Sequence, residues 1–181
     1  MNGCTHLLPT INKLKSTSFT AIHYNIGYFL LNQLELLPMI KEYQPMIISL
    51  NELGSHTNMK SIEQVLLGYE IIKVEGTNKH GGAILAIDKR ILYVRPINLH
   101  KSNIATETIS LNDSTYTITS IYSPSNTPLP LETMSLLLIY SNYTILLSDF
   151  NAKHIDRGCS TINSKGDQLS KWINDNNLTV Q

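Results

Sequence analysis

Apolar residues along the chain gather in short runs that polar, turn-forming segments separate. These runs are rich in β-branched residues and often alternate between apolar and polar positions, which is typical of strands. Two pairs of runs are joined by short turn-prone segments, around residues 76–82 and at Asn112–Asp113, and predict hairpins. The predicted strands are residues 18–28, 46–52, 69–74, 81–87, 103–111, 114–122 and 143–151.

Other segments repeat their apolar residues at helical spacing. In the first of them Leu30, Leu34, Leu37 and Ile40 recur along one face, and Pro38 should kink or split the helix. The predicted helices are residues 30–43, 61–67, 131–141 and 163–178. Strands that outnumber helices, with helices inserted between some of them, favour an α+β fold in which sheets are flanked by helices.

The last predicted helix has a recognisable start and a clear apolar face. Ser164 and Asp167 form an approximate capping box. Leu169, Trp172 and Ile173 then share one side of the helix, and Trp172 should anchor it to the core.

Three apolar runs end in side chains that carry oxygen: Asn25, Glu52, and Asp149 with Asn151. If the strand continues through residues 149–151, the last two point to the same side. If the three strands lie parallel, their ends converge on a site suited to Mg²⁺, which prefers oxygen ligands. The alternative is that these residues are turn formers and helix caps, and the pattern alone leaves both interpretations open.

Charge and composition restrict the possible partners and cellular location but do not indicate a function. The 14 basic and 14 acidic residues cancel, so a polyanionic partner must be held by a local patch. Cys4 and Cys159 fit no disulfide framework or zinc pattern, which favours reduced thiols in an intracellular protein. Residues 1–18 are expected to be a polar leader without a signal sequence or membrane span, and residues 19–181 one domain.

The motifs at the strand ends resemble those of the endonuclease/exonuclease/phosphatase superfamily, which includes DNase I. HYNIGY resembles its first motif and carries Asn25, and PMIISLNE resembles its second and carries Glu52. IYSPSN resembles the motif with an active-site tyrosine, here Tyr122, and LLSDFNAKH the motif that supplies Asp149 and Asn151. GGAILAI resembles a further strand of the family. The motifs occur in the family's order through most of the chain.

Within that superfamily, DFNAKH followed by NSKGDQLSKWINDNNL is most similar to endonuclease domains of non-LTR retrotransposons. The resemblance implies a four-layer α/β/β/α sandwich of the DNase I type. It also implies a target DNA as substrate, a nuclear location and a reverse transcriptase domain downstream.

The resemblance further implies a mechanism in which water attacks a phosphorus atom in line. Mg²⁺, or Mn²⁺ in its place, would be held by Glu52 with Asn25 and would stabilise developing charge. Asp149 would orient or deprotonate the water, Asn151 and Asn25 would position water and phosphate, and Tyr122 would hydrogen-bond a phosphate oxygen.

The sequence also departs from the family pattern. Ser148 replaces a glycine before Asp149, and Asn51 stands where glutamine is common before the glutamate; both changes are compatible with the site. The chain ends at Gln181, before the family's late Ser-x-Ile-Asp-like strand and its terminal Ser-Asp-His motif. Without its last strands the domain is expected to be marginally stable and to show little or no activity.

Two other functions stay open from the sequence. One is a phosphoesterase of the same superfamily that acts on a different phosphate ester, and the other is a non-catalytic remnant or binding domain. His154 could replace a general base, but its position in a loop favours an exposed side chain. For His23 a packed structural role is expected, and Tyr122 could simply be an aromatic residue packed at a strand end.

Overall fold

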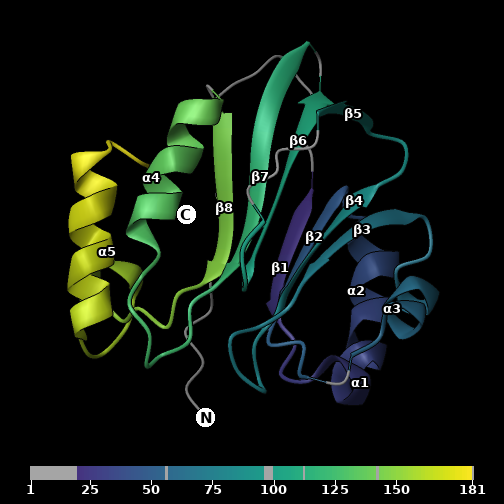
Figure 1. Ribbon diagram of the computed structural model, residues 1–181, viewed down its shortest axis with the longest axis horizontal. Coiled ribbons are helices and arrows are strands. Elements are labelled where there is room, and N and C mark those ends of the chain that lie inside the picture. The colour runs from purple at the N-terminus through teal and green to yellow at the C-terminus, as the bar shows by residue number, and fades with distance from the viewer. Residues whose placement is uncertain (1–19, 56, 96–99, 112, 142, 181) are drawn as a thin grey trace.

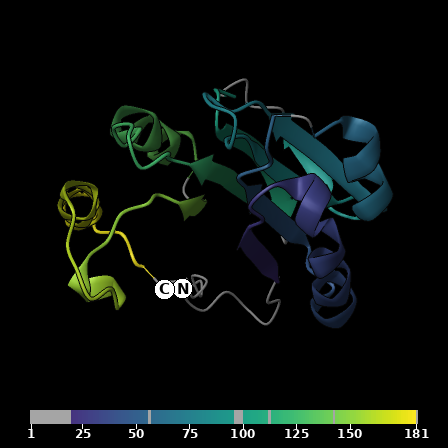
Figure 2. The same cartoon turned by 90° about the horizontal axis from the view of Figure 1, so that it is seen from below.

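The computed structural model describes residues 20–55, 57–95, 100–111, 113–141 and 143–180. The predicted leader, residues 1–18, lies outside this part of the chain. Two four-stranded sheets face each other, and helices cover the outer face of each (Figures 1 and 2). This arrangement is the four-layer α/β/β/α sandwich expected from the motifs.

The first sheet has the strand order β1-β2-β4-β3. Strands β1 and β2 are parallel, and the other pairs are antiparallel, including the predicted β3–β4 hairpin. Its strands are β1 (Ala21–Asn25), β2 (Ile47–Asn51), β3 (Tyr69–Val74) and β4 (Ala83–Asp88). The central strands β2 and β4 are buried along their whole length, which explains why they appear in the sequence as nearly continuous apolar runs.

The second sheet has the order β5-β6-β7-β8, with β6 and β7 paired as the predicted hairpin and β7 and β8 parallel. Its strands are β5 (Leu92–Arg95), β6 (Ile104–Leu111), β7 (Ser114–Tyr122) and β8 (Tyr143–Asp149). Strand β5 was not predicted from the sequence, because a four-residue edge strand is too short to show a reliable period.

The first predicted helix divides into α1 (Phe29–Asn32), the 3₁₀ turn η1 (Gln33–Glu35) and α2 (Leu36–Tyr43). The division falls just before Pro38, whose ring would clash with a carbonyl four residues earlier in a continuous α-helix. Because the tighter turn shifts the helical phase, Phe29 and Leu36 are buried, whereas Leu30, Leu34 and Leu37 are exposed. The face expected from sequence spacing therefore points largely outward.

The remaining helices are α3 (Met59–Val65), α4 (Leu131–Tyr140), the short η2 (Ile155–Arg157) and α5 (Ser164–Asp175). The α5 cap is Asn163, whose side chain accepts from the Gly166 amide, so the predicted cap at Ser164 is wrong by one residue. Trp172 anchors α5 as expected: it is buried, and its indole donates to Ser135 Oγ at 2.9 Å. No helix in the described ranges could cross a membrane.

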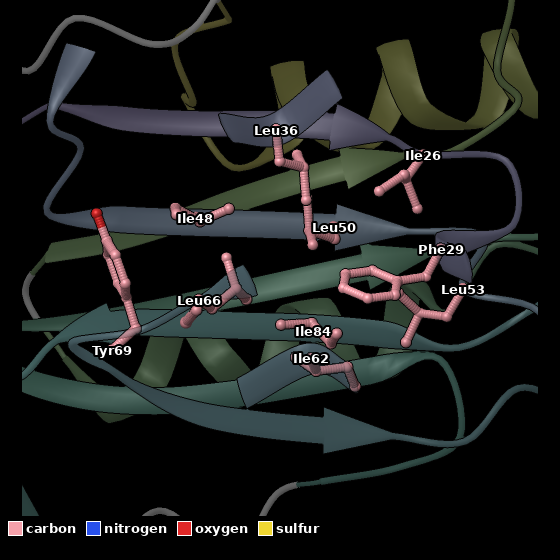
Figure 3. Packing of buried hydrophobic residues seen from close by; sticks show 11 residues of the cluster. Ile26, Phe29, Leu36, Ile48, Leu50, Leu53, Ile62, Leu66, Tyr69 and Ile84 are labelled. Atoms are coloured by element: carbon pink, nitrogen blue, oxygen red, sulfur yellow. The ribbon is translucent and has the colours of Figure 1, made fainter. Parts of the chain in front are cut away.

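Three apolar clusters hold the four layers together. The first packs α1–α3 against the first sheet (Figure 3), the second fills the space between the sheets, and the third packs α4 and α5 against the second sheet. Full burial of one Leu, Ile or Phe side chain contributes roughly 1.5–3 kcal/mol, so each cluster fixes its layers firmly. The loops at the strand ends therefore start from rigid positions.

Candidate active site

The strand ends that carry the predicted site residues meet at one end of the sandwich, the lower end in Figure 1. In the first sheet Asn25 pairs with Asn51 at the ends of β1 and β2, and in the second Tyr122 pairs with Asp149 at the ends of β7 and β8. The expected three parallel neighbours are thus two parallel pairs in two different sheets. Facing sheets bring the same residues to a common edge.

Asn51 connects the two sheets at this edge. It is fully buried, and its Nδ2 donates to the Ile121 carbonyl of β7 at 3.1 Å. Glu52 directly follows Asn51 and Tyr122 directly follows Ile121, so this bond brings Glu52 and Tyr122 close together. Asn51 Oδ1 is buried without a partner among the described residues, which leaves one acceptor for water or a bound group.

Tyr122 interacts with both carboxylates of the site. Burial raises the pKa of Tyr122 above its ordinary value, and the charge of Glu52, a hydrogen bond to Glu52 and the charge of Asp149 raise it further. The phenol is 6% exposed and stays protonated at neutral pH, so it serves as a hydrogen-bond donor. Glu52 and Asp149 are both half-buried.

The two asparagines orient the Asp149 carboxylate and its loop. Asn25 Nδ2 donates to Asp149 Oδ2 at 2.6 Å, which joins the first sheet to the second. Strand β8 ends at Asp149, so the condition for Asn151 to share its strand face is not met. A turn brings Asn151 back to the site instead. Its backbone amide donates to Asp149 Oδ1 at 3.0 Å, and its side-chain Nδ2 donates to the Ser123 carbonyl at 3.1 Å.

Backbone strain gathers in the loops around these residues. Glu52 has φ 58°, Asn151 has φ 50° and Tyr28, just after β1, has φ 72°. Asparagine tolerates the left-handed region, but glutamate and tyrosine adopt it only where their surroundings impose it. Such conformations cost of order 1–3 kcal/mol each and concentrate at functional sites.

Several residues that sequence reasoning missed hold the loop after β8 in place. Asn163 Oδ1 accepts from the amides of Lys153 (3.0 Å) and Gly166 (2.8 Å), and Asn163 Nδ2 donates to the Asn151 carbonyl at 2.9 Å. An asparagine before a helix signals a cap, but nothing in the pattern shows that it also binds a distant loop.

Lys165 is the second missed residue, and it is buried. Its Nζ donates to Ser123 Oγ at 2.7 Å, to the Ser123 carbonyl at 3.2 Å and to the Pro124 carbonyl at 2.7 Å. Burial lowers the pKa of Lys165, while the charge of Asp149 raises it. Because Asn151 contacts the same Ser123 carbonyl, Lys165 and Asn151 jointly fix the loop that follows Tyr122.

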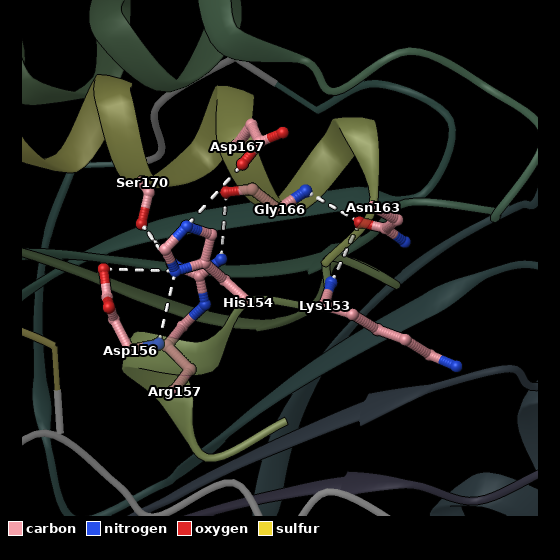
Figure 4. Close-up of polar contacts among 8 residues, drawn as sticks. All are labelled: Lys153, His154, Asp156, Arg157, Asn163, Gly166, Asp167 and Ser170. Carbon is pink, nitrogen blue, oxygen red and sulfur yellow. Dashed lines mark hydrogen bonds and ion pairs between the residues drawn. The ribbon is translucent and has the colours of Figure 1, made fainter. Parts of the chain in front are cut away.

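His154 does not lie in solvent, so its predicted exposure is wrong (Figure 4). Its side chain is only 13% exposed, with Nδ1 3.1 Å from Asp156 Oδ2 and Nε2 3.6 Å from Asp167 Oδ1. These contacts attach the loop to α5 and give the ring a structural role. His23 has the structural role expected of it, since its Nδ1 lies 2.9 Å from Ser49 Oγ.

The donors at this edge fit a divalent metal ion that prefers oxygen. Glu52 and Asp149 both raise the pKa of Tyr122, and neither forms an ion pair within the described ranges, although the charge of Asp149 acts on buried Lys165. Those ranges hold no group of three or more His, Cys, Asp and Glu side chains able to bind a metal. Carboxamide oxygens, water and a substrate phosphate would therefore complete the coordination, as Mg²⁺ commonly allows.

Comparison with known proteins agrees with this geometry. Residues 116–181 match the endonuclease-reverse transcriptase family. No curated protein matches the sequence.

Solved structures with the same fold include nucleases and a phosphatase. The endonuclease domain of TRAS1, a telomere-specific non-LTR retrotransposon, has a TM-score of 0.70 at 19% identity, with 87% of this chain and 70% of that chain covered. A mannosyl-6-phosphatase of Bacteroides thetaiotaomicron has a TM-score of 0.61 at 16% identity, with coverage of 85% and 71%. An AP endonuclease of Archaeoglobus fulgidus has a TM-score of 0.57 at 12% identity, with coverage of 87% and 70%.

These likenesses show the fold, and the family match covers the strands and helix that carry Tyr122, Asp149 and Asn151. The chain therefore has the DNase I-like fold of the endonuclease/exonuclease/phosphatase superfamily, as its motifs predicted.

Proposed function

We propose that this chain is the phosphodiesterase domain of a retrotransposon endonuclease, which cleaves one strand of a target DNA with the help of Mg²⁺ or Mn²⁺. One observation carries the proposal: Glu52, which follows β2 of the first sheet, and Asp149, at the end of β8 in the second, both act on the protonated phenol of Tyr122, and neither is in an ion pair within the described ranges. The endonuclease-reverse transcriptase match of residues 116–181 supports DNA as the substrate.

Each side chain has a distinct task in this proposal. Glu52, with Asn25 beside it, would hold the metal ion, which when bound supplies positive charge to the phosphate oxygens. Asp149, oriented by Asn25 Nδ2, accepts a proton from the attacking water. Tyr122 donates from its hydroxyl to a phosphate oxygen, and the second amide hydrogen of Asn151 is available to the water or phosphate.

The proposed function also implies a cellular location and a partner domain. A target-DNA endonuclease of this kind would act in the nucleus and would be linked to a reverse transcriptase domain in the same element. The net charge of zero gives no general attraction to DNA, so binding depends on groups near the site.

Metal binding tests the site directly. Titration of Mn²⁺ into the protein, followed by electron paramagnetic resonance of the free ion, should show a site that Glu52→Gln weakens more than about tenfold, since even outer-shell partners of a metal can change affinity that much. Glu70→Gln is the matched control, because Glu70 is an exposed carboxylate on β3. An isotherm unchanged by Glu52→Gln would remove Glu52 from the metal site.

Two substrates separate the proposed function from its alternatives. Little turnover is expected from this chain, but any turnover with Mg²⁺ should convert supercoiled plasmid to open circles and leave p-nitrophenyl phosphate intact. Turnover of p-nitrophenyl phosphate alone would instead indicate a phosphomonoesterase. DNA binding without cleavage of either substrate, and without an Mn²⁺ site that Glu52→Gln weakens, would indicate a binding domain.

A further inference from the structure

Two ring side chains stand beside the site, and the proposed reaction uses neither. Tyr28 follows β1, and His80 lies in the turn between β3 and β4. The Tyr28 side chain is 41% exposed although a tyrosine ring gains from burial. Their position next to the proposed active site suggests a role in substrate binding.

The side chains of Tyr28 and His80 come from separate loops and contact each other, so each limits the movement of the other. The Tyr28 hydroxyl lies 2.5 Å from His80 Nδ1, and the ring centroids are 5.3 Å apart in an edge-to-face arrangement with an interplanar angle of 70°. A tyrosine held at both its backbone and its hydroxyl has little rotamer freedom to lose when a ligand binds.

Backbone contacts place this pair next to the proposed metal ligand. The Tyr28 amide donates to the Glu52 carbonyl at 2.7 Å, and the Ser55 amide donates to the Lys79 carbonyl at 3.1 Å. The Tyr28 ring passes so close to Gly54 that a Cβ there would lie 2.8 Å from Tyr28 Cδ1. The loops after β1 and β2 and the β3–β4 turn thus form one continuous rim.

The conformation of Tyr28 is unfavourable for a tyrosine. Its φ of 72° lies in the left-handed region, which glycine would occupy without strain. A half-exposed ring offsets little of that cost through burial. The strain is therefore better explained by a task of the ring than by its contribution to folding.

We infer that Tyr28, braced by His80, is a platform on which an unpaired nucleobase beside the scissile phosphate stacks. Aromatic side chains in basic grooves bind nucleobases in this way, and the exposed Lys79 of the same turn supplies a cation for the neighbouring phosphate. A base within a regular duplex has its faces covered, so the platform selects DNA with an unpaired base. The inference rests on the proposed function and names the substrate form that the site prefers.

The test compares two DNA probes on the complete 181-residue chain, with Ca²⁺ in place of Mg²⁺ to prevent cleavage. One duplex carries a single bulged 2-aminopurine, and the other is fully paired. Fluorescence anisotropy should show that Tyr28→Gly weakens binding of the bulged duplex about tenfold and leaves the paired duplex unchanged. Quenching of 2-aminopurine should be lost in the same variant.

Two further variants distinguish this role from a structural one. Tyr28→Gly should keep or raise the melting temperature because it relieves strain, and Tyr28→Phe should retain most of the quenching because it keeps the ring. Tyr140→Ala, which removes an exposed tyrosine on α4, should change neither binding nor quenching.

The outcomes separate this inference from the proposed function. If the wild-type protein binds neither duplex, both are wrong. If it binds both and Glu52→Gln abolishes Mn²⁺ binding, but Tyr28→Gly has no effect or weakens both duplexes equally, only the platform is wrong. A lowered melting temperature with unchanged binding would make Tyr28 a structural residue.

Discussion

The two loops that carry the carboxylates of the site are held in different ways. The loop after β2, residues 52–55, is bound through its backbone: the amides of Tyr28 and Phe29 donate to the carbonyls of Glu52 and Leu53 at 2.7 and 3.0 Å. Buried Phe29 and Leu53 pack beneath it in the first apolar cluster. Most of these contacts do not depend on one particular polar side chain.

The loop after β8, residues 150–163, depends on individual side chains. Asn163 contacts three backbone groups, and buried Lys165 contacts three acceptors in the segment that follows Tyr122. Loss of one buried partner leaves several polar groups unsatisfied, which costs about 1–3 kcal/mol per group. Side-chain substitutions in the loop after β2 should therefore cost less stability than substitutions of the side chains that hold the loop after β8.

The largest expected contrast comes from one glycine in each region. A Cβ at Gly166 would lie 1.8 Å from the Lys153 carbonyl oxygen, and backbone cannot move aside easily. At Gly54 the nearest atom belongs to the Tyr28 side chain, which can rotate, although the φ of 81° strains any alanine. We expect Gly166→Ala to cost about 3 kcal/mol or more of the free energy of unfolding and Gly54→Ala about 1–2 kcal/mol.

Urea denaturation of both variants measures this contrast. Equal losses would mean that the loop after β8 can shift as a whole, and the proposed difference between the loops would be lost.

The features that could be predicted from the sequence differ between these two regions as well. The paired strands β3–β4 and β6–β7 and the candidate residues at strand ends were predictable, because alternation and turn residues act locally. The edge at which we propose metal binding could be located because its residues end apolar runs. The pairing of β1 with β2 and of β7 with β8 in separate sheets could not, because sequence alone does not assign strands to sheets.

The contacts of the loop after β8 could not be predicted from the sequence, for a physical reason. Lys165 and His154 are polar residues in a polar segment, and such residues are usually exposed. Their burial results from the docking of α5 on the loop, a contact between segments that no local period encodes. Phe29 and Leu36 were missed similarly, because a 3₁₀ turn changes the helical phase between them.

A smaller contrast compares the caps of two helices, one on each side of the sandwich. The Asn58 side chain caps α3 and, among the residues that the structure describes, accepts only from the Ser61 amide, whereas the Asn163 side chain caps α5 and also binds Lys153 and Asn151. We expect Asn58→Ala to cost about 1 kcal/mol of the free energy of unfolding and Asn163→Ala about 2 kcal/mol. Only Asn163→Ala should also weaken Mn²⁺ binding, since the Asn163 side chain bonds directly to the site residue Asn151, whereas the Asn58 side chain bonds to Ser61 on α3.

Thermal unfolding and the Mn²⁺ titration check this pair together. If Asn163→Ala lowers stability no more than Asn58→Ala and leaves Mn²⁺ affinity intact, Asn163 is an ordinary cap and the loop after β8 is held by other contacts.

The smallest effect concerns Tyr122, where the two regions touch. Because burial and Glu52 raise the pKa of its phenol in the folded state, the unfolded chain loses this proton first as the pH rises above about 10. The stability that this tyrosine contributes is complete below that pH and is lost above it, by at most about 1.4 kcal/mol per pH unit. Tyr122→Phe should therefore flatten the alkaline decline of the free energy of unfolding.

Urea melts between about pH 9 and 11 measure that decline, with a residual slope expected from Tyr24 and Tyr69, whose pKa values are also raised. Tyr140→Phe on the exposed side of α4 shows whether loss of any tyrosine has the same effect. If wild type and Tyr122→Phe decline in parallel, the folded protein does not raise the pKa of this phenol, so Tyr122 is neither buried at this edge nor close to Glu52 and Asp149. The two loops would then not form one site, and the proposed placement of a metal ion at this edge would have to be abandoned.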